Sequence, residues 1–164
     1  MRVRVLAATI LGLAWHPLGA QEAVDTRVFQ VLAQATMDAE STVAFVSPFE
    51  NSLVHYDATP LLTLNHVDTF FVQASGDDGR AFLLVRLSED GRRELERRTV
   101  GFRGRQVVTV VEGSVERTML LKRPYRSTYP ILIASGLIDH EEATSRADRL
   151  NHQLHMLKQE KDDA

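Results

Sequence analysis

The chain has 164 residues, a formal net charge of −3 and no cysteine. The charge balance disfavours a general nucleic-acid binder, which is normally basic. Without cysteine there are no disulfides, so packing must stabilise the fold. The length suits one domain with its own core.

Residues 1–20 have the pattern of a secretory signal peptide. Arg2 and Arg4 precede an uncharged apolar run over residues 5–15, and small residues occupy positions 18–20. The run is shorter than the roughly 20 residues that a membrane span needs. We therefore predict export to the periplasm, or secretion, with an uncleaved N-terminal anchor as the alternative. Removing the two arginines leaves a formal charge of −5.

The mature region, residues 21–157, is expected to form a single domain, followed by a charged flexible tail over residues 158–164. Residues 28–31 fit either an edge strand or the start of a helix that runs to Ala39, because periodicity does not separate the two. Thr63 is a predicted N-cap of a short helical turn. Further strands are predicted over residues 42–46, 53–56 and 70–74.

The most regular pattern begins at Ala81. Residues 81–87 are apolar on both faces apart from Arg86, which predicts a central strand packed under helices. Ser88 is a good N-cap for the helix that follows. Gly91 weakens a helix, and we expect it to allow a close approach of helix to sheet. The buried stripe of this helix is predicted to be Leu87, Gly91, Leu95 and Thr99.

A hairpin and a closing helix follow. Residues 107–111 and 115–121 flank Glu112-Gly113 as two strands joined by a tight turn. Residues 131–134 form a last predicted strand. Asp139 begins the last helix, whose predicted buried stripe is Ala143, Ala147, Leu150, Leu154 and Leu157. The predicted fold class is α+β, with a single, mainly antiparallel sheet and two or three helices packed on one face.

Four of these segments, in order and spacing, resemble the head subdomain of the large periplasmic domain of SecD and SecDF, accessory subunits of bacterial protein export. The segments are residues 60–67, 83–99, 107–115 and 136–150. The resemblance covers about residues 56–152. It departs from the family at Glu112, where an aspartate is usual, and at residues 117–120, where a proline is usual. It implies a stand-alone exported SecD-like domain, and in the family the head contacts the emerging polypeptide.

No residue pattern indicates catalysis or a cofactor. His152 and His155 are three apart and could share a helix face as metal ligands do, but no further ligand stands at a typical spacing, so surface histidines are the simpler interpretation. Ser88, Ser114 and Ser127 lie in no nucleophile motif. We therefore predict no catalytic residue, no metal and no cofactor, and a protein that is not an enzyme.

The predicted partner-binding residues are arginines and tyrosines. Arginine forks bind carboxylates and phosphates, and both residue types are favoured in interfaces. The simpler interpretations are a solvated helix face, with the arginines paired to glutamates, and Tyr129 as part of the core. The predicted residues are Arg92, Arg93, Arg97, Arg103, Arg105, Arg123, Tyr125, Arg126 and Tyr129. If residues 107–111 lie at a sheet edge, a peptide could also add there as a strand.

Three functions compete. The leading hypothesis is a non-enzymatic periplasmic protein-binding module that resembles the SecD head and is linked to protein export or envelope protein handling. The alternative is a dedicated periplasmic inhibitor or immunity-type protein for one exported partner. The third is a hydrolase with an unrecognised site. The predicted partner is a protein or polypeptide, with no nucleic acid and no stable membrane span after signal cleavage.

Overall fold

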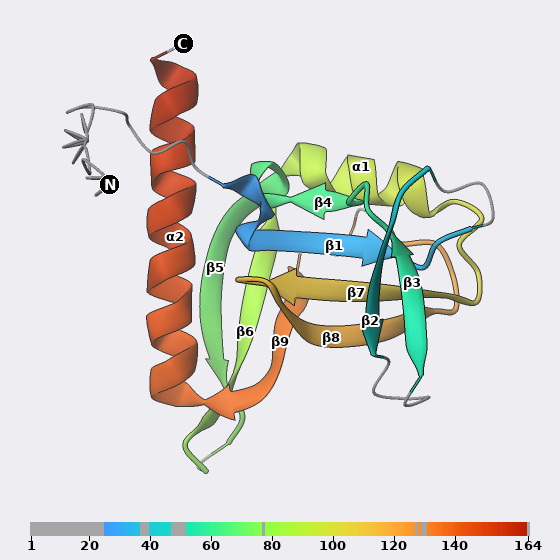
Figure 1. Ribbon diagram of the computed structural model, residues 1–164. Helices are drawn as coiled ribbons and strands as arrows, with labels where there is room; N and C mark the ends of the chain where they lie inside the picture. Colours follow the sequence, from blue (N-terminus) through green and yellow to red (C-terminus); the bar gives the residue numbers. More distant parts are fainter. Residues whose placement is uncertain are drawn as a thin grey trace, which may run out of the picture.

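The strands of the computed structural model form three antiparallel sheets (Figure 1). The structure describes residues 25–36, 40–46, 52–76, 78–126, 128 and 131–163, so the predicted signal peptide and Tyr129 lie outside the described residues. The first sheet has the order β4 (Leu62–Thr63), β1 (Phe29–Ala33), β7 (Arg105–Val111), β8 (Ser114–Leu121). The second is the hairpin of β2 (Thr42–Val46) and β3 (Leu53–Asp57). The third has the order β5 (Val67–Ala74), β6 (Arg80–Leu87), β9 (Ile131–Asp139).

Two helices and two short 3₁₀ turns, η1 (Thr26–Val28) and η2 (Leu64–His66), complete the described fold. Helix α2 (His140–Asp162) packs along β5 and β6, whereas α1 (Glu89–Thr99) packs against η2, β4 and β6 (Figure 1). The α+β class and the antiparallel pairing are confirmed. The prediction of a single sheet is wrong, since the described strands form three sheets, whereas the two described helices agree with the predicted two or three.

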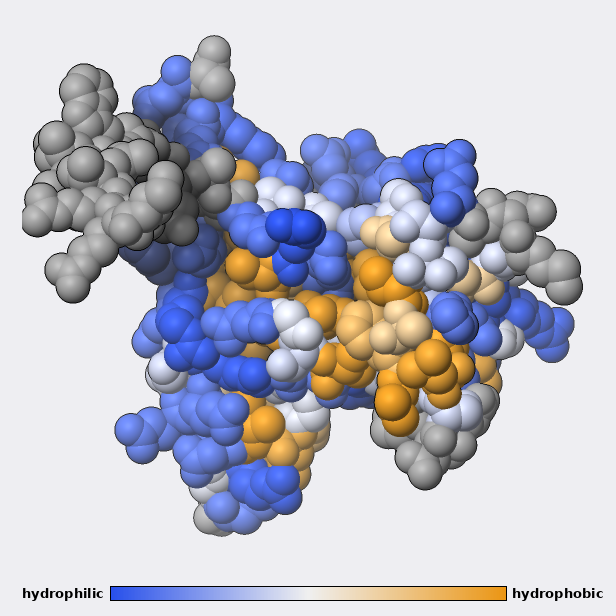
Figure 2. Space-filling model, viewed as in Figure 1, coloured by the Kyte–Doolittle hydropathy of each residue, from blue (hydrophilic) through white to orange (hydrophobic). Residues whose placement is uncertain are grey.

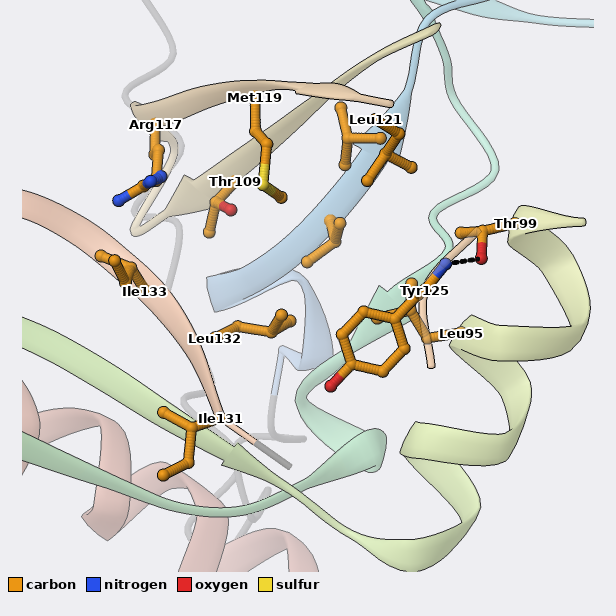
Figure 3. A pocket seen from close by; sticks show the side chains of 12 residues that line it. Leu95, Thr99, Thr109, Arg117, Met119, Leu121, Tyr125, Ile131, Leu132 and Ile133 are labelled. Carbon is orange, nitrogen blue, oxygen red and sulfur yellow. Dashed lines mark hydrogen bonds between the residues drawn. The ribbon is translucent and has the colours of Figure 1, made fainter. Parts of the chain in front are cut away.

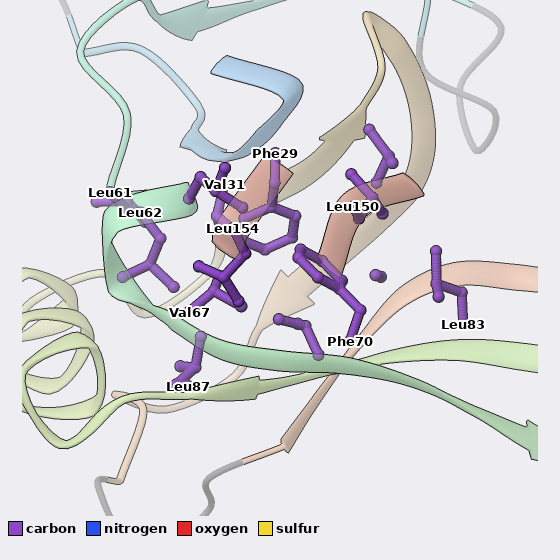
Figure 4. Packing of buried hydrophobic residues seen from close by; sticks show 14 of the residues in the cluster. Phe29, Val31, Leu61, Leu62, Val67, Phe70, Leu83, Leu87, Leu150 and Leu154 are labelled. Atoms are coloured by element: carbon purple, nitrogen blue, oxygen red, sulfur yellow. The ribbon is translucent and has the colours of Figure 1, made fainter. Parts of the chain in front are cut away.

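The physical reason for separate sheets is the core, which lies between the four-stranded and three-stranded sheets rather than under one sheet. Phe29 of β1 meets Phe70 of β5 edge-on, with ring centroids 5.5 Å apart (Figure 4). Leu83 of β6 and Leu150 of α2 belong to the same buried cluster. Burying the apolar faces of two sheets and a helix against one another removes more apolar surface from water than one open sheet would.

Two strand positions differ from expectation. β1 is a strand, but it lies between β4 and β7 and is therefore neither an edge strand nor a helix start. β7 lies between β1 and β8, so it offers no free edge to an added peptide. The reason is the same for both: their side chains are buried almost throughout, and a buried strand needs backbone partners on both sides.

Local signals set the helix starts as predicted. The Ser88 hydroxyl accepts the Gly91 N–H at 3.1 Å, and an Asp139 carboxylate oxygen accepts the Glu141 N–H at 2.9 Å. Both predicted buried stripes are confirmed. Helix α2 continues to Asp162, and the Lys158 ammonium donates to the Asp68 carbonyl at 3.2 Å, within the segment predicted as a tail.

Gly91 allows a close approach, but to a turn rather than to a sheet. A Cβ at this position would lie 2.3 Å from the carbonyl oxygen of His66 and 2.9 Å from its Cβ. That carbonyl accepts the Ser88 N–H at 3.0 Å and the Ser88 hydroxyl at 3.2 Å. The glycine therefore lets α1 begin directly against η2.

The turn between β7 and β8 has two residues with positive φ, Glu112 at 50° and Gly113 at 81°. Two positive φ values in a two-residue hairpin turn are typical of type I′, whose twist matches that of the flanking strands. The predicted hairpin is confirmed, with β7 and β8 reaching Arg105 and Leu121.

The β2–β3 hairpin packs on the face of the four-stranded sheet that is turned away from the main core. Val54 and Tyr56 are buried there against Leu32 and Val108. Figure 2 shows apolar side chains gathered over this region. The hairpin also exposes large apolar side chains: Val43, Val46 and Leu53.

Candidate functional site

An apolar pocket of about 220 Å³ lies between the inner face of the four-stranded sheet and the start of β9 (Figure 3). Helix α1 and the segment after β8 close its other side. Most of its walls are apolar, with a few polar groups among them. The lining residues are Val31, Leu95, Thr99, Val107, Thr109, Arg117, Met119, Leu121, Tyr125, Ile131, Leu132 and Ile133.

The strand period explains why these side chains converge. Alternate residues of a strand face the same side, and Arg117, Met119 and Leu121 line the pocket from β8. The neighbouring strand β7 adds Val107 opposite Met119 and Thr109 opposite Arg117. The pocket is therefore a continuation of the core at the point where the two sheets diverge.

Tyr125 forms one end of the pocket. Its backbone N–H donates to the Thr99 hydroxyl at 3.0 Å, and Thr99 is fully buried on α1. The Tyr125 hydroxyl oxygen is buried and has no hydrogen-bond partner among the described residues. Burial raises the pKa of Tyr125 to about 12, with the positive charge of Arg92 opposing the rise. Buried hydroxyls are usually hydrogen-bonded, so this hydroxyl is free to donate to an added acceptor.

Arg117 lines the pocket on the side away from Tyr125 (Figure 3). It is half-buried, and within the described part of the chain it has no ion-pair partner. Its neighbour Glu116 is the extra residue of a β-bulge, since Thr109 faces Arg117 while Val110 faces Val115. The Glu116 carboxylate accepts instead from the Arg146 guanidinium at 2.8 Å. A cation therefore lies beside an apolar cavity with its nearest acid in sequence engaged elsewhere.

Exposed apolar side chains and unpaired strand edges surround the pocket. Met119 is 37% exposed and Ile131 44% exposed. β8 and β9 each have only one strand partner, so each carries an outer edge in the described sheets. Sheet edges are normally covered or charged, and exposed apolar residues beside them are typical of an interaction site.

The predicted arginines do not form one cluster. On α1, Arg93 pairs with Glu89, and Arg97 donates to Glu94 at 2.7 Å, as a solvated helix face would. The hydrogen bond from Arg97 lowers the pKa of Glu94. Such exposed pairs contribute little to stability.

Two other predicted arginines have distinct surroundings. Arg105 stacks on the Phe102 ring, 4.0 Å from its centroid, and donates to the Gln34 carbonyl, which gives it a structural role. Arg92 lies close enough to Tyr125 to affect its pKa.

The remaining predicted residues lie on loops. Arg123 and Arg126 are exposed beside Tyr125, in a segment that follows the pocket-lining Leu121. Arg103 is exposed in the loop before β7. None of these three arginines has an ion pair among the described residues. The structure therefore places Arg123 and Arg126 beside Tyr125, which itself lines the pocket, and leaves Arg103 apart.

An ion-pair network ties the β7–β8 hairpin to α2. The Arg149 guanidinium donates to both carboxylate oxygens of Glu112, at 3.0 and 3.1 Å. These hydrogen bonds lower the pKa of Glu112. The side chains of Arg146 and Glu116 are only 15% and 12% exposed. The Glu112 side chain therefore has a local role, because it links the β7–β8 turn to α2.

No group of three or more His, Asp or Glu side chains among the described residues is arranged to hold a metal ion. His152 and His155 are exposed on α2, and Ser88 is engaged as a helix cap. None of the described helices combines the length and apolar character that crossing a bilayer requires.

The pocket residues of β8 and β9 were absent from the sequence-based prediction. The one local signal for them is the alternation Arg117, Met119, Leu121, which is typical of a strand with one apolar face. Their meeting with β9 depends on contacts between distant segments, and only Tyr125 was predicted for this site.

Comparison with known proteins identifies the class of fold. No protein-family model matches the chain, and no curated protein matches it. The structure is similar to a crystal structure of SecDF in a super-membrane-facing form, with a TM-score of 0.54 and 16% sequence identity. The match covers 74% of this chain and 18% of that one, so the chain corresponds to a small part of SecDF. The fold is SecD-like.

Proposed function

We propose that this chain is a non-enzymatic periplasmic protein-binding module that corresponds to the SecD head subdomain and takes part in protein export or envelope protein handling. The observation that carries the proposal is the apolar pocket, with its exposed apolar rim, between the edges of β8 and β9. The SecD-like fold supports the link to protein export, and the signal-peptide pattern of residues 1–20 supports the periplasmic location.

The pocket favours an apolar side chain of an extended polypeptide. Its volume of about 220 Å³ is below the roughly 300–1,000 Å³ of pockets that hold drug-sized ligands. Burial of one Leu- or Phe-sized side chain contributes about 1.5–3 kcal/mol. Two such side chains contribute at most about 6 kcal/mol, so the expected Kd is tens of micromolar or weaker. Weak binding of many clients suits a protein that handles unfolded chains.

The test is binding to a fluorescent polypeptide kept unfolded by reduction and alkylation of its cysteines, with the same polypeptide in its folded form as the comparison. Met119→Ser and Ile131→Ser each remove an apolar side chain from the rim of the pocket without changing the charge of the protein. We expect each substitution to weaken binding severalfold. Leu53→Ser is the matched control, because Leu53 is an exposed apolar residue on the β2–β3 hairpin, away from the pocket.

Two results would overturn the proposal. One is no binding of the unfolded polypeptide at millimolar concentration. The other is a loss of binding in Leu53→Ser but not in the rim variants, which would assign binding to the β2–β3 hairpin. Thermal unfolding of each variant shows that it is folded.

A further inference from the structure

We propose that Arg117 makes the pocket selective for apolar segments that carry an acidic residue two positions from the inserted apolar side chain. This inference rests on the proposed function and adds the class of polypeptide that the site takes. The partner is an extended peptide segment of apolar and acidic residues.

The first step is the unmatched charge of Arg117. Withdrawing a guanidinium partly from water beside apolar walls is unfavourable unless a counter-charge or acceptors compensate it. Among the described residues no carboxylate pairs with Arg117, and the Glu116 carboxylate is engaged by Arg146. A partner that supplies an anion beside Arg117 would compensate this charge.

The second step is the spacing along β8. Arg117 and Met119 face the pocket from alternate positions, and two residues of a strand span roughly 6.6–6.8 Å. A segment that lies extended beside β8 has the same period. When its apolar side chain enters the pocket near Met119, its residue two positions away lies opposite Arg117. An acidic residue at that position forms the cross-strand ion pair.

The third step is the charge at the other end of the pocket. Lys122, Arg123 and Arg126 are exposed in the segment around Tyr125, and neither arginine has an ion pair among the described residues. Cations therefore stand at both ends of the pocket, although the whole chain is negatively charged. This local field favours acidic segments and repels basic ones. The Tyr125 hydroxyl can donate to a backbone carbonyl of the bound segment, an acceptor that the described residues do not supply.

The experiment uses three fluorescent nine-residue peptides with leucine at the centre and Glu, Gln or Lys at both positions two residues away. Fluorescence anisotropy gives the Kd of each. We expect the Glu peptide to bind about three- to tenfold more tightly than the Gln peptide, and the Lys peptide to bind most weakly. The Glu preference should shrink in 0.5 M salt.

Variants assign the preference to Arg117. In Arg117→Gln the preference for Glu over Gln should shrink to the part that Lys122, Arg123 and Arg126 contribute. In Arg117→Glu the order should reverse, with the Lys peptide bound more tightly than the Glu peptide. Arg103→Gln is the matched control, since Arg103 is also an arginine without an ion pair among the described residues but does not line the pocket. It should leave the preference unchanged.

The outcomes separate this inference from the proposed function. If the unaltered protein binds all three peptides equally and Met119→Ser binds them more weakly, the acidic preference is refuted and the polypeptide site stays in place. A preference for Glu that is undiminished in Arg117→Gln would also refute the role of Arg117. If none of the peptides and no unfolded polypeptide binds, the proposed function fails. Binding to vesicles of anionic lipid, but to none of the peptides, would assign the cations to a membrane surface and overturn the inference.

Discussion

Replacing Gly91 with alanine tests whether α1 is held directly against η2. In a helix interior, Gly to Ala is favourable by about 1 kcal/mol from intrinsic propensity alone. Here the added Cβ would lie 2.3 Å from the His66 carbonyl oxygen, so the helix and η2 must separate by about 1 Å to reach ordinary contact. Overpacking of this kind costs about 1–3 kcal/mol.

The His66 carbonyl cannot move freely, because it accepts two hydrogen bonds from Ser88, the residue that caps α1. Disturbing the cap adds about 1 kcal/mol. Subtracting the propensity gain, we expect Gly91→Ala to lower the free energy of unfolding by about 1–3 kcal/mol.

Urea denaturation measures this effect as a lower midpoint at an unchanged slope. Gly136→Ala is the matched control, since Gly136 lies in β9 without a positive φ and an added Cβ there meets no atom within 4 Å. It should change stability by less than about 1 kcal/mol. The reasoning is refuted if Gly91→Ala stabilises the protein by about 1 kcal/mol, as propensity alone requires.

Two further predictions concern ionisable groups. The folded-state pKa of Glu112 lies below its usual value of 4.5, so its stabilising effect is present above pH 4.5 and is lost as the pH falls through the folded-state pKa. In Glu112→Gln, urea denaturation should therefore show a smaller loss of stability below pH 4.5 than in the unaltered protein; an identical pH profile would contradict the Arg149 pairing. The raised pKa of Tyr125, about 12 against 10, means that stability falls between pH 10 and pH 12, as the unfolded state releases its proton first. Tyr125→Phe should lose the phenol that titrates near pH 12 by ultraviolet absorbance and keep or gain stability, because it removes a buried hydroxyl without a partner; a loss of about 2 kcal/mol would indicate a partner for that hydroxyl.

Local signals in the sequence predicted the helix starts, the buried helix stripes and the β7–β8 turn, because each depends on residues within a few positions of one another. Ser135-Gly136 shows where such signals fail. Glycine and serine suggested that the last strand ends there, yet β9 continues to Asp139. The Ser135 hydroxyl accepts the Leu83 N–H at 3.3 Å where the β6–β9 register shifts, so these residues form an irregularity within the strand rather than its end.

The candidate site shows the same limit. Tyr125 was predicted from its residue type and its arginine-rich surroundings, as part of an exposed contact loop. Its hydroxyl instead points into the protein, because Thr99 fixes the backbone of Tyr125 against α1. Arg117 was not predicted, since its importance depends on the pairing of β8 with β7, which forms the bulge at Glu116, and on the approach of β9, whose pocket-lining residues lie more than ten positions away.

Helix α1 links the close contact at Gly91 to the pocket, because the same helix contributes residues to both. Leu95 and Thr99 lie one and two turns beyond Gly91 on the same buried stripe of α1, and both line the pocket. Thr99 in turn holds the Tyr125 backbone. Moving α1 away from η2 would therefore displace one wall of the pocket while leaving the β8 wall, with Arg117 and Met119, in place. Gly91→Ala should consequently weaken the binding of the leucine peptides but preserve the order Glu, Gln, Lys, since the charge that sets the order lies on the wall that does not move. A reversal of that order in Gly91→Ala would show that α1, rather than β8, determines which segments are bound.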